Sequence, residues 1–114
     1  MMEYYFQNVG TGRYMDVEGP SSASGAAIQQ WDLHAGNQEK WIIQHVANSG
    51  GYVRIKSAYS NLYLGINYAD TSSVVQYSST GKDTLWKFKR SETGNLQLIC
   101  KSTEASEVVL AVPT

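Results

Sequence analysis

A short segment recurs three times along this chain of 114 residues. The letters GRYMDV are echoed by NLYLGI and again by EVVLAV, which places Asp16, Gly65 and Ala111 at equivalent positions, 49 and then 46 residues apart. Trp41 and Trp86 each open an apolar run, and they are 45 residues apart. A period of about 46 residues indicates one supersecondary unit that stacks on its own copies to bury a shared core.

Each unit is made of strands. Short runs rich in apolar, β-branched and aromatic residues recur at roughly ten-residue spacing, separated by Gly, Ser, Asn and Asp, and no window keeps a helical period over three turns. This pattern predicts an all-β barrel or sandwich. The predicted strands are Tyr4–Val9, Arg13–Val17, Ala27–Trp31, Trp41–Val46, Tyr52–Ala58, Leu62–Ile66, Val74–Tyr77, Trp86–Arg90, Leu96–Ser102 and Val108–Val112.

The units follow one another within a single domain, residues 1–114. With four strands per unit, the first repeat runs over residues 1–49 and the second over 50–91. A partial third repeat, 92–114, contains two strands.

The charge and the apolar content of the chain limit the kinds of partner that it is expected to bind. A formal net charge of −1 argues against nucleic acid or an anionic membrane, because both require a basic surface. No stretch approaches the roughly 20 apolar residues of a membrane span. The start, MMEYYFQNVGTG, has no basic region followed by an apolar one, so we predict no signal peptide. The chain is therefore expected to be cytoplasmic or a module excised from a larger secreted protein.

Polar residues gather between Asp16 and Trp41. Asp16 is followed by Gln29 and Trp31, thirteen and fifteen residues later. A pyranose ring packs its C–H face on an aromatic ring and needs hydrogen-bond partners for its hydroxyls. An ionised Asp accepts from two hydroxyls, and amides both donate and accept. This combination favours a sugar site.

The letters YMDV, AIQQW and GNQEKW resemble those of ricin B-like (R-type) lectins, which are β-trefoils of three four-strand units. The resemblance implies that Asp16 binds sugar hydroxyls, that Trp31 is the stacking platform, and that Gln29 supports Asp16 or contacts a hydroxyl. It also implies paired amides on the rim, here Asn37 and Gln38. His34 is a weaker candidate for a sugar contact. Galactose-type sugars are the commonest ligands of the family.

One departure from the family concerns the Gln-x-Trp signature, because two residues separate Gln38 from Trp41. Either Glu39 takes the place of the Gln, or one extra residue bulges there.

A second departure is the open end. In the family fold, the first and fourth strands of each unit line a six-stranded barrel, and this chain is expected to supply five of the six. The unpaired edges would invite association. The missing sixth strand has three possible explanations: the chain is truncated, a second subunit completes the barrel in a homodimer, or irregular chain closes the third unit. We favour the first two.

The later units are expected to have lost the sugar site. In the second, Tyr77 keeps an aromatic side chain, but Gly65 replaces the Asp and Val75 replaces Gln29. In the third, Ala111 stands at the Asp position.

Simpler roles exist for several of these residues. Asp16 could bond turn backbone and Trp31 could cover its hairpin, while Trp41 and Trp86 are expected to pack in the core. We assign His45 no function.

We predict no catalytic residues, metal or cofactor, because two His and one Cys show no triad or ligand spacing. Cys100, the lone cysteine, excludes an internal disulfide.

The sequence thus predicts a non-enzymatic lectin or carbohydrate-binding module whose partner is a glycan or polysaccharide. Two alternatives stay open: a protein-binding trefoil, such as an inhibitor or toxin-complex subunit, and a structural module of a larger carbohydrate-active protein.

Overall fold

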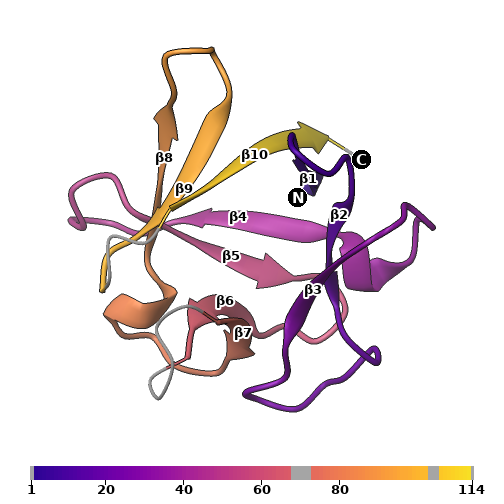
Figure 1. Ribbon diagram of the computed structural model, residues 1–114. Helices are drawn as coiled ribbons and strands as arrows, with labels where there is room; N and C mark the ends of the chain where they lie inside the picture. The colour runs from indigo at the N-terminus through magenta and orange to yellow at the C-terminus, as the bar shows by residue number, and fades with distance from the viewer. Residues whose placement is uncertain (1, 68–72, 103–105, 114) are drawn as a thin grey trace.

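The computed structural model describes residues 2–67, 73–102 and 106–113. It is all-β apart from two single-turn 3-10 helices, as predicted (Figure 1). The elements are β1 Glu3–Asn8, β2 Tyr14–Val17, β3 Ile28–Trp31, η1 Asn37–Glu39, β4 Trp41–His45, β5 Val53–Ser57, β6 Tyr63–Ile66, β7 Val74–Tyr77, η2 Lys82–Thr84, β8 Trp86–Arg90, β9 Leu96–Cys100 and β10 Ser106–Pro113.

Six strands form a closed antiparallel ring. β1 pairs with β4, β4 with β5, β5 with β8, and β8 with β9. β10 then pairs with both β9 and β1. Its partners include Ile99 opposite Ser106 and Tyr4 opposite Pro113. The two ends of the described chain therefore lie side by side (Figure 1).

The expected open barrel is wrong. We expected five of six barrel strands and two unpaired edges, yet β10 pairs with β9 over residues 106–109 and with β1 over residues 109–113. An eight-residue strand is long enough to pair first with β9 and then, further along, with β1. The third repeat thus closes the ring from within the chain, and no second subunit is needed to complete the barrel.

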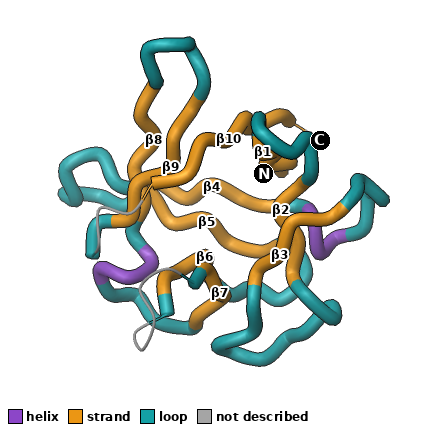
Figure 2. The backbone as a smooth tube through the Cα atoms, viewed as in Figure 1, coloured by secondary structure: helices purple, strands orange, loops and turns teal. Residues whose placement is uncertain are grey.

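Two hairpins, β2–β3 and β6–β7, lie beside the ring, and each is followed by a 3-10 turn (Figure 2). η1 packs against β2, and η2 packs against β6. The indole Nε1–H of Trp41 donates to the carbonyl oxygen of Met15 at 3.0 Å, and that of Trp86 donates to Leu64 at 2.8 Å. The two tryptophans thus join each hairpin to the barrel strand that follows it.

The core lies between the barrel strands and the two hairpins. Both tryptophans are buried, as predicted from their positions at the start of apolar strands. Because each fully buried apolar side chain contributes roughly 1.5–3 kcal/mol, this cluster dominates the stability. Its members are Phe6, Val17, Trp41, Val53, Ile55, Leu64, Ile66, Trp86, Leu98 and Cys100.

In the described part of the chain, neither helix has the length and apolar character needed to cross a membrane.

Candidate functional site

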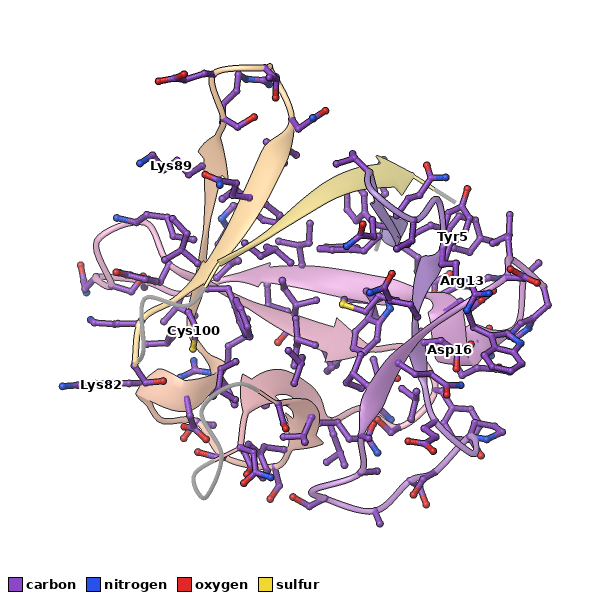
Figure 3. All side chains as sticks on the ribbon, viewed as in Figure 1. Tyr5, Arg13, Asp16, Lys82, Lys89 and Cys100 are labelled. Atoms are coloured by element: carbon purple, nitrogen blue, oxygen red, sulfur yellow. The ribbon has the colours of Figure 1, made fainter. Side chains whose placement is uncertain are left out.

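The β2–β3 register brings the predicted residues together. Asp16 lies opposite Gln29, and Tyr14 lies opposite Trp31. Gln29 and Trp31 are two residues apart on β3, so their side chains lie on the same face of the strand. The Asp16 side chain is 4% exposed, and its Oδ1 accepts a hydrogen bond from Gln29 Nε2 at 3.1 Å. Figure 3 shows Asp16 on β2, on the side of the molecule that carries η1. The predicted pairing of Asp16 with Gln29 is therefore present.

His34 lies at the centre of the site. It follows β3 in the chain, and its Nε2 is 2.9 Å from Asp16 Oδ2. The same nitrogen is 3.4 Å from Glu39 Oε2. Its side chain is 37% exposed, whereas both carboxylates are almost completely buried. His34 is thus the solvent-facing member of an Asp–His–Glu cluster.

Glu39 is the residue that the sequence analysis missed as part of the site. Its Oε1 accepts hydrogen bonds from the backbone N–H groups of His34 at 2.8 Å and Ala35 at 3.2 Å. Its Oε2 is buried without a hydrogen-bond partner. Glu39 ends η1, and Trp41 opens β4 two residues later. This geometry favours the first of the two alternatives, in which Glu39 takes the place of the Gln in the signature.

An open cavity of about 420 Å³ lies over the cluster. Trp31 lies on its rim with 52% of its surface exposed, so its indole is accessible to a ligand. The nine lining residues are Asp16, Val17, Glu18, Gly19, Pro20, Gln29, Trp31, His34 and Gln38.

The two predicted rim amides differ. Gln38 lines the cavity, whereas Asn37 is exposed and is absent from the lining. A Cβ atom at Gly36 would lie 2.4 Å from Gln38 Oε1, so the glycine leaves room for that side chain. The structure therefore brings Asp16, Gln29, Trp31, His34 and Gln38 to one cavity and leaves Asn37 outside it.

The equivalent place in the second hairpin is filled. A Cβ at Gly65 would lie 3.0 Å from the Tyr77 ring and 3.0 Å from the Asp83 carbonyl oxygen. Counting from the paired tryptophans, Ser79 stands where His34 does and Thr84 where Glu39 does. None of the three equivalent positions carries a carboxylate or an imidazole, although the neighbouring Asp83 is buried. The degraded second site at Tyr77 stays a prediction.

Another cavity, of about 400 Å³, lies between β1, β2, β3 and the start of β7. Its lining includes Phe6, Met15 and Val74 and, among the described residues, contains no carboxylate. Because a ligand site usually combines shape with convergent polar groups, the Asp16 cavity is the stronger candidate.

Sequence comparison identifies the class. The ricin-type β-trefoil lectin-like domain family matches residues 2–77 and, in a second alignment, residues 40–113. Together the two matches cover nearly the whole chain, so the chain belongs to this family. The resemblance inferred from the motifs is confirmed.

Solved structures agree on the β-trefoil fold. A designed three-fold symmetric protein, ThreeFoil, has a TM-score of 0.83 and 22% identity, over 96% of this chain and 88% of that one. An exo-β-1,3-galactanase from Clostridium thermocellum has a TM-score of 0.84 and 19% sequence identity, and the match covers 100% of this chain and 30% of the enzyme. An endo-β-galactosidase from Clostridium perfringens, which releases GlcNAcα1-4Gal, has a TM-score of 0.78 and 14% sequence identity. That match covers 100% of this chain and 33% of the enzyme. This chain thus spans about a third of each enzyme's length.

Proposed function

We propose that this protein is a carbohydrate-binding module that holds a saccharide in the Asp16–Trp31 cavity without catalysing a reaction on it. The observation that carries the proposal is an exposed indole beside a buried, hydrogen-bonded carboxylate in one open cavity. Membership of a lectin-like family supports the same assignment.

Trp31 provides the apolar part of the recognition. An exposed indole on a cavity rim offers a flat surface for the C–H face of a pyranose, and burying that surface on both partners is favourable. Because β3 holds Trp31 through its pairing with β2, the ring is positioned before the ligand arrives.

The polar part differs from the simple expectation that Asp16 alone binds two hydroxyls. A carboxylate has about four acceptor positions, and Gln29 and His34 occupy one on each oxygen. Asp16 therefore orients these two side chains and offers its remaining lone pairs to the cavity. His34 and Gln38 complete the rim, because each has polar atoms that can bond a hydroxyl.

The affinity of such a site is expected to be low. The ligand exchanges hydrogen bonds with water for hydrogen bonds with protein, and the net gain per bond is small. We expect a dissociation constant on the order of 0.1–1 mM, or about 4–5.5 kcal/mol. Several copies acting together would raise this through avidity.

Galactose-type sugars are the favoured ligands within this proposal. Two structural neighbours are, by name, a β-1,3-galactanase and a galactosidase that releases GlcNAcα1-4Gal. A module attached to such an enzyme would serve by binding related glycans. A protein-binding trefoil would be expected to have this pocket closed or filled by its own side chains, whereas the cavity beside Trp31 is open.

A glycan array followed by calorimetry tests the proposal. Trp31→Ala should lose at least about tenfold in affinity for the selected sugar, or about 1.4 kcal/mol, while Trp31→Phe keeps measurable binding. The matched control is Tyr59→Ala, which removes an aromatic side chain that is 42% exposed and does not line the cavity. Sugar binding that Trp31→Ala leaves unchanged would overturn the site assignment.

A further inference from the structure

The Asp16–His34–Glu39 cluster concentrates negative charge below the surface. One ligand atom from each side chain lies within 4.8 Å of the other two. Among the described residues, His34 is the only basic side chain within ion-pair distance of either carboxylate. Burying charge is unfavourable unless it is compensated. A proton on His34 supplies one positive charge against two carboxylates, whereas a divalent cation supplies two.

A metal bound between the three side chains would replace the hydrogen bond between His34 Nε2 and Asp16 Oδ2 and leave the outer hydrogen bonds in place. Gln29 uses Asp16 Oδ1, and the backbone donors use Glu39 Oε1, so both of these hydrogen bonds can persist. The other two oxygens, Asp16 Oδ2 and Glu39 Oε2, converge on His34 Nε2. Glu39 is 0% exposed, and its Oε2 is an orphaned buried acceptor aimed at this point. A cation bound between the three side chains would give this oxygen a partner.

The spacing suits a first-row transition metal. Two ligand atoms about 2.0–2.1 Å from one ion lie about 2.9 Å apart at a right angle and about 3.3 Å apart at the tetrahedral angle. The observed separations from His34 Nε2 are 2.9 Å to Asp16 and 3.4 Å to Glu39. Imidazole with carboxylates is a donor set for Zn²⁺ and its neighbours rather than for Ca²⁺, which prefers oxygen alone.

The trefoil backbone does not require this cluster. In the second hairpin, η2 makes the same turn hydrogen bonds as η1, with Thr84 N–H to Gly81 O at 3.1 Å and Glu39 N–H to Gly36 O at 3.0 Å. There, Thr84 satisfies the turn with its hydroxyl, which bonds the carbonyls of Ser79 and Gly81. The second repeat also buries one carboxylate, Asp83 on η2, whose Oδ1 accepts from Ser79 Oγ at 3.1 Å and whose Oδ2 lacks a hydrogen-bond partner. Only the first repeat, among the described residues, brings two buried carboxylates and a histidine together.

We propose that Asp16 Oδ2, His34 Nε2 and Glu39 Oε2 bind a divalent transition metal of the Zn²⁺ class. Asp16 and His34 line the same cavity as Trp31, and His34 is 37% exposed, so an ion held by these side chains would be accessible from that cavity. If the proposed sugar site is correct, a saccharide hydroxyl would fill a remaining coordination position of the ion. Metal binding itself does not depend on the sugar.

The experiment titrates untagged protein with Zn²⁺, and in parallel with Co²⁺ for its visible absorption, in the absence of sugar. We expect one ion per chain and a large shift of the His34 ring nitrogen signals in NMR spectra. Only two histidines are present, and the exposed His45 on β4 is the internal control because its signals should stay in place. His34→Gln and Glu39→Gln should each weaken binding at least about tenfold, since even partners that do not touch a metal cost that much. His45→Gln should bind as the wild type does.

Three results would overturn the proposal: no ion bound at millimolar metal, equal shifts of both histidines, or unchanged affinity in His34→Gln. Asp16→Asn serves as an additional ligand variant should Glu39→Gln fold poorly. A parallel sugar titration with EDTA separates the two hypotheses. Sugar binding that survives EDTA while Zn²⁺ fails to bind would leave the proposed function intact and reject the metal site. Zn²⁺ binding without any sugar binding would support the metal site and reject the proposed function.

Discussion

At the scale of single residues, Glu39 holds the site in shape. Its Oε1 accepts from two consecutive backbone N–H groups of the loop that carries His34. Glu39→Ala would remove this acceptor and leave a cavity, so we expect a loss of about 2–4 kcal/mol in the free energy of unfolding. Glu39→Gln keeps a carbonyl oxygen in the same place and should stay within about 1 kcal/mol of wild type. Urea denaturation of both variants measures the difference, and equal stability of the two would contradict this role.

Sequence reasoning reached part of this site. The strand register made Asp16 and Gln29 neighbours and left Trp31 exposed, as the spacing predicted. His34 was underrated, because a polar turn residue carries no signal of what it touches. Its partner Asp16 is eighteen residues away in the chain.

The prediction of two rim amides, Asn37 and Gln38, was only half right in its placement of side chains at the cavity. Asn37 and Gln38 were favoured because the family pairs two amides, but Glu39 takes the place of the signature Gln, so the pair shifts by one position to Gln38 and Glu39. The structure therefore lines the cavity with Gln38 and buries Glu39. The Gln-like spacing of Glu39 to Trp41 was visible in the sequence and was the available signal.

At the scale of elements, the β6–β7 hairpin has closed over its own version of the site. Gly65→Asp restores the missing carboxylate in sequence, yet its Cβ would meet the Tyr77 ring. We expect the variant to lose about 1–3 kcal/mol through overpacking and to gain no second sugar site. Thermal melting and the binding stoichiometry measure both effects. A stable variant that binds two sugars per chain would show that the second hairpin had only lost its carboxylate.

The two hairpins are joined through Gln76. This side chain is 0% exposed, and its Nε2 donates to the carbonyl oxygens of Ser21 and Ala23, each at 2.9 Å. Its Oε1 accepts from Ser60 Oγ at 2.7 Å. Gln76→Ala would leave these groups without their partner, at an expected cost of about 2–4 kcal/mol.

The equivalent residue of the first repeat provides the control for that prediction. Gln30 occupies the same place in IQQW as Gln76 does in VVQY, but it is exposed and contacts only Thr11 Oγ1 among the described hydrogen bonds. Gln30→Ala should cost less than about 1 kcal/mol. Similar losses in the two variants, measured by denaturant unfolding, would mean that Gln76 does not join the hairpins.

At the scale of the whole molecule, closure of the barrel governs association. The 46-residue period and the evenly spaced strands predicted a repeated all-β fold, and the motif resemblance implied the trefoil, which the comparisons confirm. They could not predict closure, because EVVLAV echoes a hairpin strand, and a sequence pattern does not show that one strand will pair with two neighbours. Those pairings of β10 with β9 and β1 leave the ring without the exposed edge that would favour a dimer.

We therefore expect a monomer at micromolar concentration, measured by light scattering coupled to gel filtration. Val109→Pro provides the contrast, because Val109 is paired with both Leu96 and Asn8, and proline removes its backbone N–H. The variant should be less stable and more prone to association. A wild-type dimer would contradict the closed ring as the solution form.

The central claim is that a saccharide binds in the cavity between the Trp31 indole and the Asp16 cluster. The most direct measurement is a ¹H–¹⁵N NMR titration with galactose-type sugars, because the chain has three indole N–H groups and two of them are buried in hydrogen bonds to Met15 and Leu64. The account predicts that the Trp31 indole signal and the side-chain amides of Gln29 and Gln38 shift together in a saturable way. If a sugar bound to saturation while the signals of Trp31, Gln29 and Gln38 stayed in place and only residues elsewhere shifted, the proposed site would be wrong.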